Sequence, residues 1–219
     1  MKRRCLILAN GDFPLKGNVS YLVKMGYSTL FCADGGANTA YKMGLLPNYI
    51  VGDFDSISKE TLEHFKKDCK IIHITGQDDT DVEKCIKLAI KLKYKEAILL
   101  GATGDRLDHS FCNIGILLKF RDKINLKLLH HNSIMETAEN KIMLHTVTNE
   151  IISIYGISRK TIITSTGLKY PLSKTSLPFG EKESTSNVAN SDKVELRIKN
   201  GVILIVRDFK KMKKYGLFK

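Results

Sequence analysis

The stretch TDVEKCIKLAIKLKYKEAILLGATGDRLDH, residues 80–109, decides the fold because it holds a helical pattern, a strand pattern and a polar loop in succession. Its apolar residues recur at helical spacing: Val82, Cys85, Ile86, Ala89 and Ile90. That spacing predicts a helix over residues 81–93, with Thr80 as N-cap and Glu83 completing a capping box. The run AILL, residues 97–100, then predicts a buried strand that ends at a glycine-rich loop.

The same alternation of helical and strand patterns extends over the first part of the chain. Short apolar runs predict strands at residues 5–9, 29–33, 49–51, 71–75, 97–100 and 126–129. Strands that alternate with helices are typical of βαβ units and a parallel sheet. We therefore expect an N-terminal α/β nucleotide-binding domain with a parallel sheet over residues 1–131.

Beyond about residue 132 the hydrophobic pattern changes to a period of two. Apolar residues alternate with polar neighbours around Ile142 and Leu144, and again around Val194 and Leu196. The Asn200-Gly201 pair between alternating segments predicts a tight hairpin turn, and the polar stretch 171–186 predicts a long loop. We expect residues 132–219 to form a C-terminal antiparallel β-sandwich domain.

Composition limits the classes of protein. The chain is 43% hydrophobic and 26% charged, and its net charge of +12 comes mostly from scattered lysines. The dense basic run KKMKK, residues 210–214, is typical of a solvated helix face, so nucleic acid is not an expected partner.

Cysteine usage and hydropathy indicate the compartment. The five cysteines lack CxxC spacing, which indicates small buried residues in a reducing cytoplasm. The apolar run at residues 5–9 is too short for a signal peptide, and no later run is long enough for a membrane span. We therefore expect a cytoplasmic location without membrane contact.

Carboxylates follow the expected strands in four clusters. They are DGGAN (34–38), GDFDS (52–56), QDDTD (77–81) and GATGDRLDH (101–109). Parallel strands bring their carboxyl ends to one sheet edge, which is where open α/β sheets bind ligands. Converging carboxylates need a counter-charge, and Mg²⁺ carrying a polyphosphate supplies it most simply.

The second and third clusters are the candidate metal site. Asp53 and Asp55 are two residues apart, so on an extended segment both side chains face the same way, and a cation between them would relieve their repulsion. Such pairs are also common in solvated turns that precede a helix. Asp81, in the first turn of the predicted helix, is a candidate metal ligand or a group that orients a nucleophilic hydroxyl, whereas Asp79 is better explained as a partner of the helix dipole.

The helix starts are the candidate phosphate sites. Thr80 and Asp81 mark a helix N-terminus, whose free N–H groups favour bound phosphate. Arg106 offers bidentate phosphate contact, with Asp108 and His109 at the next helix start. His109 fits a general base and equally a histidine hydrogen-bonded to its neighbours.

The first cluster has two readings. Asp34 stands at a strand end facing the expected crevice, and Gly35 either makes a tight turn or lets backbone approach a nucleotide. Neither GxxxxGK[ST] nor GxGxxG is present.

In order and spacing, these clusters together with TGLKYPL (166–172) and STSN (184–187) resemble the thiamine pyrophosphokinase family. The resemblance covers nearly the whole chain. It implies Mg²⁺-dependent transfer of pyrophosphate from ATP to thiamine, giving thiamine diphosphate and AMP, in a homodimer with a shared active site. It assigns ATP and metal binding to the first domain, and thiamine binding and dimerisation to the second.

The resemblance also implies roles for individual residues. Asp53, Asp55 and Asp81 would bind Mg²⁺ and, with Arg106, form the catalytic set. The ATP phosphates would be held by the following residues: Asp34, Gly35, Thr80, Asp81, Arg106, Asp108 and His109. Thiamine would be bound by Tyr170, Ser184, Ser186 and Asn187.

The chain departs from the family pattern at two points. Asp105 stands where the family commonly has a second glycine, and the chain has no tryptophan, so thiamine stacking would fall to Tyr170. Two other functions remain compatible with the sequence: a nucleotide-dependent transferase for another hydroxyl acceptor, and a non-catalytic nucleotide- or thiamine-binding module.

Overall fold

A computed structural model describes residues 3–13 and 15–218 of the chain. The chain divides into two compact units, residues 1–131 and 132–219. The boundary falls where the hydrophobic pattern changes its period. Within the described residues, no helix has the length and apolar character needed to cross a membrane.

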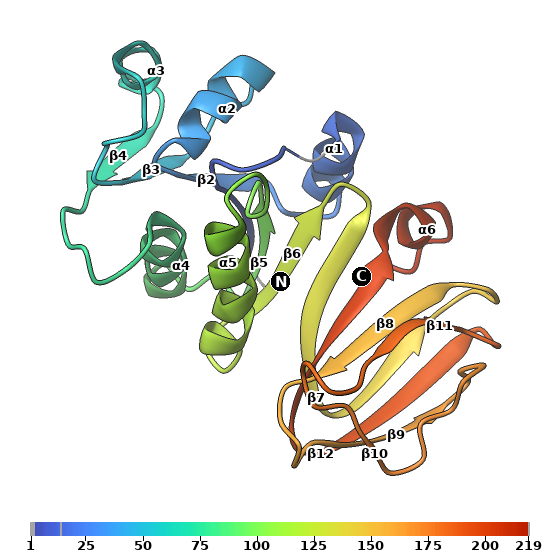
Figure 1. Ribbon diagram of the computed structural model, residues 1–219. Helices are drawn as coiled ribbons and strands as arrows, with labels where there is room; N and C mark the ends of the chain where they lie inside the picture. The colour runs from blue at the N-terminus through green and yellow to red at the C-terminus, as the bar shows by residue number, and fades with distance from the viewer. Residues whose placement is uncertain (1–2, 14, 219) are drawn as a thin grey trace. The chain divides into compact units, whose positions relative to one another are not determined.

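The first unit is built on a parallel sheet, with the order β6-β5-β1-β2-β3-β4 (Figure 1). Its strands are β1 (Arg4–Leu8), β2 (Thr29–Ala33), β3 (Tyr49–Gly52), β4 (Lys70–His73), β5 (Glu96–Leu100) and β6 (Asn125–His130). Every strand predicted for this part of the chain is present. The central strands β1 and β5 are almost wholly buried, so their apolar runs are continuous rather than alternating.

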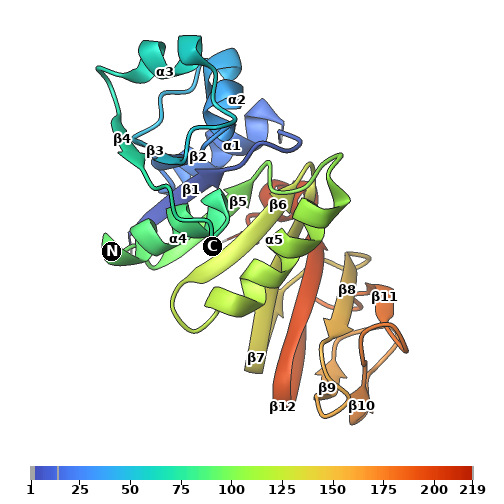
Figure 2. The ribbon, with the colours of Figure 1, turned by 60° about the vertical axis from the view of Figure 1, so that its left-hand side comes forward.

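Helices cover both faces of this sheet (Figure 2). They are α1 (Lys16–Lys24), α2 (Gly36–Met43), α3 (Lys59–Phe65), α4 (Asp81–Lys91) and α5 (Leu107–Phe120). The predicted capping box of α4 is confirmed: the Thr80 side chain accepts from the Glu83 N–H, and the Glu83 carboxylate accepts from the Thr80 N–H. Helices α2 to α5 follow strands of this parallel sheet, so their N-termini lie near the edge of the sheet at which the strands end.

The strand order reverses at β1. The chain builds β2, β3 and β4 on one side of β1, and then β5 and β6 on the other. Loops after β1 and β5 meet at this reversal: Gly11 N donates to Gly101 O at 2.7 Å, and Asp12 N to Thr103 O at 2.7 Å. A Cβ on Gly11 would lie 2.3 Å from Thr103 O, so the close approach requires glycine. Open α/β sheets bind ligands at such a reversal.

The second unit is antiparallel throughout its described pairings. Its elements are β7 (Ser133–His145), β8 (Ile151–Gly156), β9 (Ile162–Thr166), β10 (Thr175–Ser176), β11 (Ser184–Val188), β12 (Lys193–Asp208) and α6 (Phe209–Lys214). Strand β12 pairs with β7, β8 and β9, so it organises the unit. A buried ion pair, Arg207 Nε to Glu150 Oε1 at 2.7 Å, lies within it.

The predicted hairpin at Asn200-Gly201 is wrong. Strand β12 runs straight through this pair, and both its halves pair with the same strand, β7. The register shifts between Arg197 and Val202, Asn200 has φ 59°, and a Cβ on Gly201 would lie 2.0 Å from Thr161 Oγ1. The pair therefore forms an irregularity of the bulge type, which uses the same residues as a tight turn without reversing the chain.

The predicted long loop over residues 171–186 is also only partly right. It contains the short strand β10 and the first residues of β11. The basic run at residues 210–214 lies in α6, in which Phe209 and Met212 are buried. That helix therefore has the solvated basic face that the sequence predicted.

Candidate active site

Three carboxylates meet at the carboxyl edge of the first unit. Asp34 follows β2, Asp53 follows β3 and Asp81 opens α4, and one oxygen of each lies within 4.8 Å of the others. We call these three residues the carboxylate cluster. Such mutual approach is unfavourable for ionised carboxylates unless a positive charge lies among them.

Asp34 is held rigidly at the bottom of the cluster. The residue is 2% exposed and has φ 39°, and its carboxylate accepts the Ser56 N–H at 2.9 Å and the Ile57 N–H at 3.3 Å. The pKa of Asp34 is raised to about 6, chiefly by burial and also by the nearby Asp55 and Asp81 carboxylates, against the lowering effect of the Ser56 hydrogen bond. These hydrogen bonds fix the position of the Asp34 carboxylate before any ligand binds, and the raised pKa shows that the site disfavours its charged form.

Asp53 has one satisfied and one unsatisfied oxygen. Its Oδ2 accepts from Gln77 Nε2 at 2.9 Å, and this hydrogen bond holds the pKa of Asp53 below its usual range. Its Oδ1 is buried and has no hydrogen-bond partner among the described residues. A buried unpaired carboxylate oxygen is costly, and a bound cation would satisfy it. An all-carboxylate ligand set suits a hard cation such as Mg²⁺.

Lys84 supplies a positive charge from within the protein. Its side chain is 4% exposed, and its Nζ lies 2.9 Å from Asp81 Oδ1. Burial alone would lower the pKa of Lys84, but the hydrogen bond to Asp81 and the charges of Asp81, Asp53 and Asp34 outweigh burial and raise it. Lys84 therefore offsets part of the repulsion in the carboxylate cluster and fixes the orientation of Asp81.

Of the three predicted metal ligands, two lie in the carboxylate cluster and one lies outside it. Asp53 and Asp81 belong to the carboxylate cluster, and Asp34 takes the third place. Asp55 is exposed and accepts from Ser56 Oγ at 2.7 Å, although it lies near enough to Asp34 to raise the pKa of that residue.

Of the two neighbours before α4, Asp79 pairs with Lys87, with Nζ to Oδ1 at 2.6 Å, and Thr80 caps the helix. Asp79 therefore has a structural partner of its own. The Thr80 side chain is already engaged in capping α4. A phosphate at this helix end would therefore be bound by backbone N–H groups of the first turn rather than by the Thr80 side chain.

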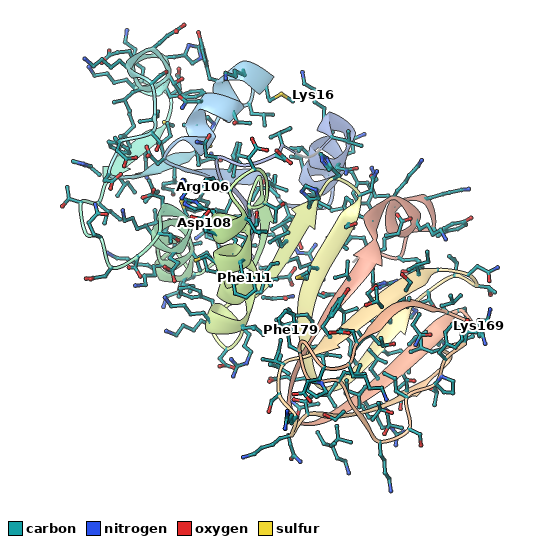
Figure 3. All side chains as sticks on the ribbon, viewed as in Figure 1. Lys16, Arg106, Asp108, Phe111, Lys169 and Phe179 are labelled. Atoms are coloured by element: carbon teal, nitrogen blue, oxygen red, sulfur yellow. The ribbon has the colours of Figure 1, made fainter. Side chains whose placement is uncertain are left out.

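The glycine-rich loop carries the predicted phosphate-binding arginine. Arg106 is exposed and makes a bidentate pair with Asp108, with Nε to Oδ1 at 2.9 Å and Nη2 to Oδ2 at 2.6 Å (Figure 3). The guanidinium holds the pKa of Asp108 below its usual range. The loop itself is anchored by Asn113, whose Nδ2 donates to Ala102 O at 2.7 Å. His109 and Asp105 are exposed beside it.

The four predicted thiamine contacts lie together in the second unit, around Asn187. Asn187 is 2% exposed, and its Nδ2 donates to Tyr170 O at 2.8 Å and to Ser184 Oγ at 2.9 Å. Its Oδ1 accepts from Tyr170 N at 3.2 Å. Asn187 therefore holds two of the predicted contacts in place. The Tyr170 ring is exposed, with Lys169 Nζ 5.5 Å from its centroid, and Ser186, with φ 56°, is also exposed.

Sequence reasoning missed Lys84 and Gln77, and it assigned Asp34 to the nucleotide rather than to the carboxylate cluster. The signal for Lys84 was its position three residues after Asp81 on the same helix face. No comparable signal marked Gln77, because its hydrogen bond to Asp53 joins two loops that are distant in sequence.

The fold and the site define a class: α/β enzymes with an acidic ligand site at the carboxyl edge of a parallel sheet, followed by an antiparallel unit. Two family models match the chain. "Thiamin pyrophosphokinase, catalytic domain" covers residues 23–128, and "Thiamin pyrophosphokinase, vitamin B1 binding domain" covers residues 139–203. The chain belongs to the thiamine pyrophosphokinase family, whose members are enzymes.

Individual relatives agree with this membership. Thiamin pyrophosphokinase 1 of Caenorhabditis elegans is 29% identical over 172 residues, which cover 73% of this chain and 70% of that protein. Thiamine pyrophosphokinase 3 of Oryza sativa subsp. japonica is 30% identical over 206 residues, covering 80% and 76%. The solved structure of thiamin pyrophosphokinase from Candida albicans shares the fold, with a TM-score of 0.82 at 21% identity, covering 94% of this chain and 89% of that one.

Proposed function

We propose that this chain transfers the terminal pyrophosphoryl group of ATP to the hydroxyl of thiamine, giving thiamine diphosphate and AMP. Membership of the family supports the reaction. The observation that carries the chemistry is the carboxylate cluster, in which one buried oxygen of Asp53 has no hydrogen-bond partner within the described part of the chain. A polyphosphate substrate arrives with a divalent cation that would satisfy this oxygen.

The residues that would hold Mg²⁺ are Asp34, Asp53 and Asp81, with Asp55 alongside. Bound there, the ion would offset the negative charge of the polyphosphate. The buried Lys84 beside Asp81 contributes to the same positive potential.

The remaining chemistry needs positioning more than a strong base. The hydroxyl oxygen of thiamine bonds to the β-phosphorus and releases its proton to water. The bond from that phosphorus to the oxygen that bridges to the α-phosphorus breaks, and AMP leaves with that oxygen. Arg106 exchanges its bidentate partner Asp108 for phosphate oxygens, a change that costs little because both groups are exposed. Asp81, oriented by its ion pair with Lys84, orients the attacking hydroxyl.

Thiamine would be bound by the second unit, which we infer to be a β-sandwich. Tyr170 offers its exposed ring for stacking, and Ser184 and Ser186 offer hydroxyl groups. Asn187 acts by holding Tyr170 and Ser184. We propose a cytoplasmic homodimer with shared active sites. In each site, the thiamine-binding residues of one chain would hold thiamine next to the carboxylate cluster of the other chain.

The test is to incubate the protein with ATP and Mg²⁺, with and without thiamine, and to identify the nucleotide products. AMP that forms only with thiamine supports the proposal. ADP would indicate an ordinary kinase, and AMP formed only with another hydroxyl compound would indicate a different acceptor. Binding of ATP or thiamine without turnover would indicate a non-catalytic module.

A further inference from the structure

A second group of metal-type ligands lies in the first unit, at the ends of other strands. One carboxylate oxygen of Asp12 and one ring nitrogen each of His130 and His131 lie within 4.8 Å of one another. Asp12 follows β1, His130 ends β6 and His131 follows it. The two imidazole rings are adjacent, with centroids 4.2 Å apart. The proposed reaction assigns none of these three residues a role.

A hydrogen bond with Thr103 orients the ring of His130. Thr103, in the loop after β5, places its Oγ1 2.7 Å from His130 Nδ1. When Nδ1 carries the proton and donates to this hydroxyl, the lone pair stays on Nε2. Histidines that bind metals are typically fixed in this way, with one ring nitrogen engaged and the other left for the ion.

His131 is held in an unfavourable backbone conformation. Its φ is 47°, a region that costs energy for a residue with a side chain. Asn18, which is 1% exposed on α1, donates from Nδ2 to His131 O at 2.7 Å and secures this conformation. The surrounding structure therefore maintains a strained residue whose side chain lies against a second histidine.

Asp12 is tied to the same framework. Its N–H donates to Thr103 O at 2.7 Å, so the residue that orients His130 also anchors the segment bearing Asp12. Segments after β1, β5 and β6 are thus joined around one point. The three ligands are therefore held together by segments that are distant in sequence, unlike charged residues that are neighbours only because they share one turn.

We propose that Asp12, His130 and His131 bind one transition-metal ion of the Zn²⁺ class, at a site separate from the carboxylate cluster. Imidazole nitrogen suits Zn²⁺, Co²⁺ and Ni²⁺, whereas Mg²⁺ prefers oxygen ligands, so the two sites differ in the metal they select. Two histidines and one carboxylate leave a coordination position for water or an anion.

The experiment uses the full chain without a polyhistidine tag, in a Cys112→Ser background because the exposed Cys112 thiol would itself bind such metals. Co²⁺ is added in the presence of excess Mg²⁺ and followed by its visible absorption, and Zn²⁺ binding is measured by calorimetry. We expect one ion per chain. His130→Gln and His131→Gln should each weaken binding by about tenfold or more, and Thr103→Val, which removes only the orienting hydroxyl, by about tenfold.

The matched control is His64→Gln, which removes an exposed histidine on α3 and should leave binding unchanged. Far-UV circular dichroism establishes that each variant is folded. The proposal is overturned if no stoichiometric binding occurs or if both histidine variants bind Co²⁺ as the parent does. It is equally overturned if Asp53→Asn abolishes Co²⁺ binding, because the ion would then occupy the carboxylate cluster.

Discussion

Asp34→Asn should remove a pH-dependent contribution to stability in the metal-free protein. The carboxyl of Asp34 has its pKa raised from 3.8 to about 6. The folded state therefore binds this proton more tightly than the unfolded state. The contribution is fully present below about pH 4 and is lost as the pH rises through about 6. Without metal, the free energy of unfolding of the wild type should fall over this interval relative to the variant.

The size of the effect follows from the shift in pKa. A rise of about two pH units corresponds to about 3 kcal/mol, and partial solvent screening of the cluster reduces this to about 2 kcal/mol. The asparagine retains one oxygen that can accept the Ser56 N–H. The variant should therefore lose part of the local hydrogen bonding at every pH, and the pH-dependent difference isolates the charge.

The assay is urea unfolding in a chelator across pH 4 to 8, followed by circular dichroism. Asp68→Asn is the control, because Asp68 is an exposed carboxylate before β4, at the opposite edge of the sheet. Excess Mg²⁺ should stabilise the wild type above pH 6 and have a much smaller effect on Asp34→Asn. Parallel pH profiles for wild type and Asp34→Asn in chelator would refute the reasoning, since Asp34 would then ionise without cost.

Four further outcomes are expected. Asp53→Asn should abolish thiamine-dependent AMP formation while circular dichroism shows an intact fold; wild-type turnover at limiting Mg²⁺ would contradict the metal assignment. Asp105→Gly should lower the KM for ATP, because it removes a negative charge from the phosphate loop, and an unchanged KM would mean that this side chain points away. Glu150→Ala should destabilise the fold by about 3–5 kcal/mol in urea unfolding, because it leaves a buried arginine unpaired; a change below about 1 kcal/mol would contradict this. Refolding Asp81→Asn together with Tyr170→Ala chains should restore about a quarter of wild-type activity if the two chains share each site, whereas inactive mixed dimers, detected by native mass spectrometry, would rule out sharing.

Local patterns were sufficient to predict the strands of the first unit and the helix α4. Strand β5 is a continuous apolar run and α4 has a complete capping box, so periodicity and end signals agree at these two elements. The carboxyl edge was predictable for the same reason, because parallel strands all end on one side. What remained ambiguous was which carboxylates meet there. Asp34 and Asp55 both follow strands, and only the turn at Phe54, with φ 66°, decides that Asp55 lies outside the cluster.

The second unit shows where local reasoning fails. An Asn-Gly pair supports positive φ in a hairpin turn and in a bulge alike, and the partner strand decides between them. The flanking residues Arg197 and Val202 pair with Lys141 and Glu139 on β7, more than fifty residues earlier, and no local pattern predicts this pairing. The hydrogen bonds by which Asn187 holds Tyr170, seventeen residues earlier, could likewise not be predicted from local patterns. Its contact with thiamine stays a prediction from the family resemblance.

The continuity of β12 has a consequence for synthesis on the ribosome. Because residues 193–208 pair with β7, β8 and β9, none of these strands has its full set of partners until that segment has left the exit tunnel. The parallel pairings within the first unit, by contrast, are complete once β6 is made. Nascent chains should therefore carry a folded first unit while the second still exposes unpaired strand edges, the state in which a chaperone is most needed.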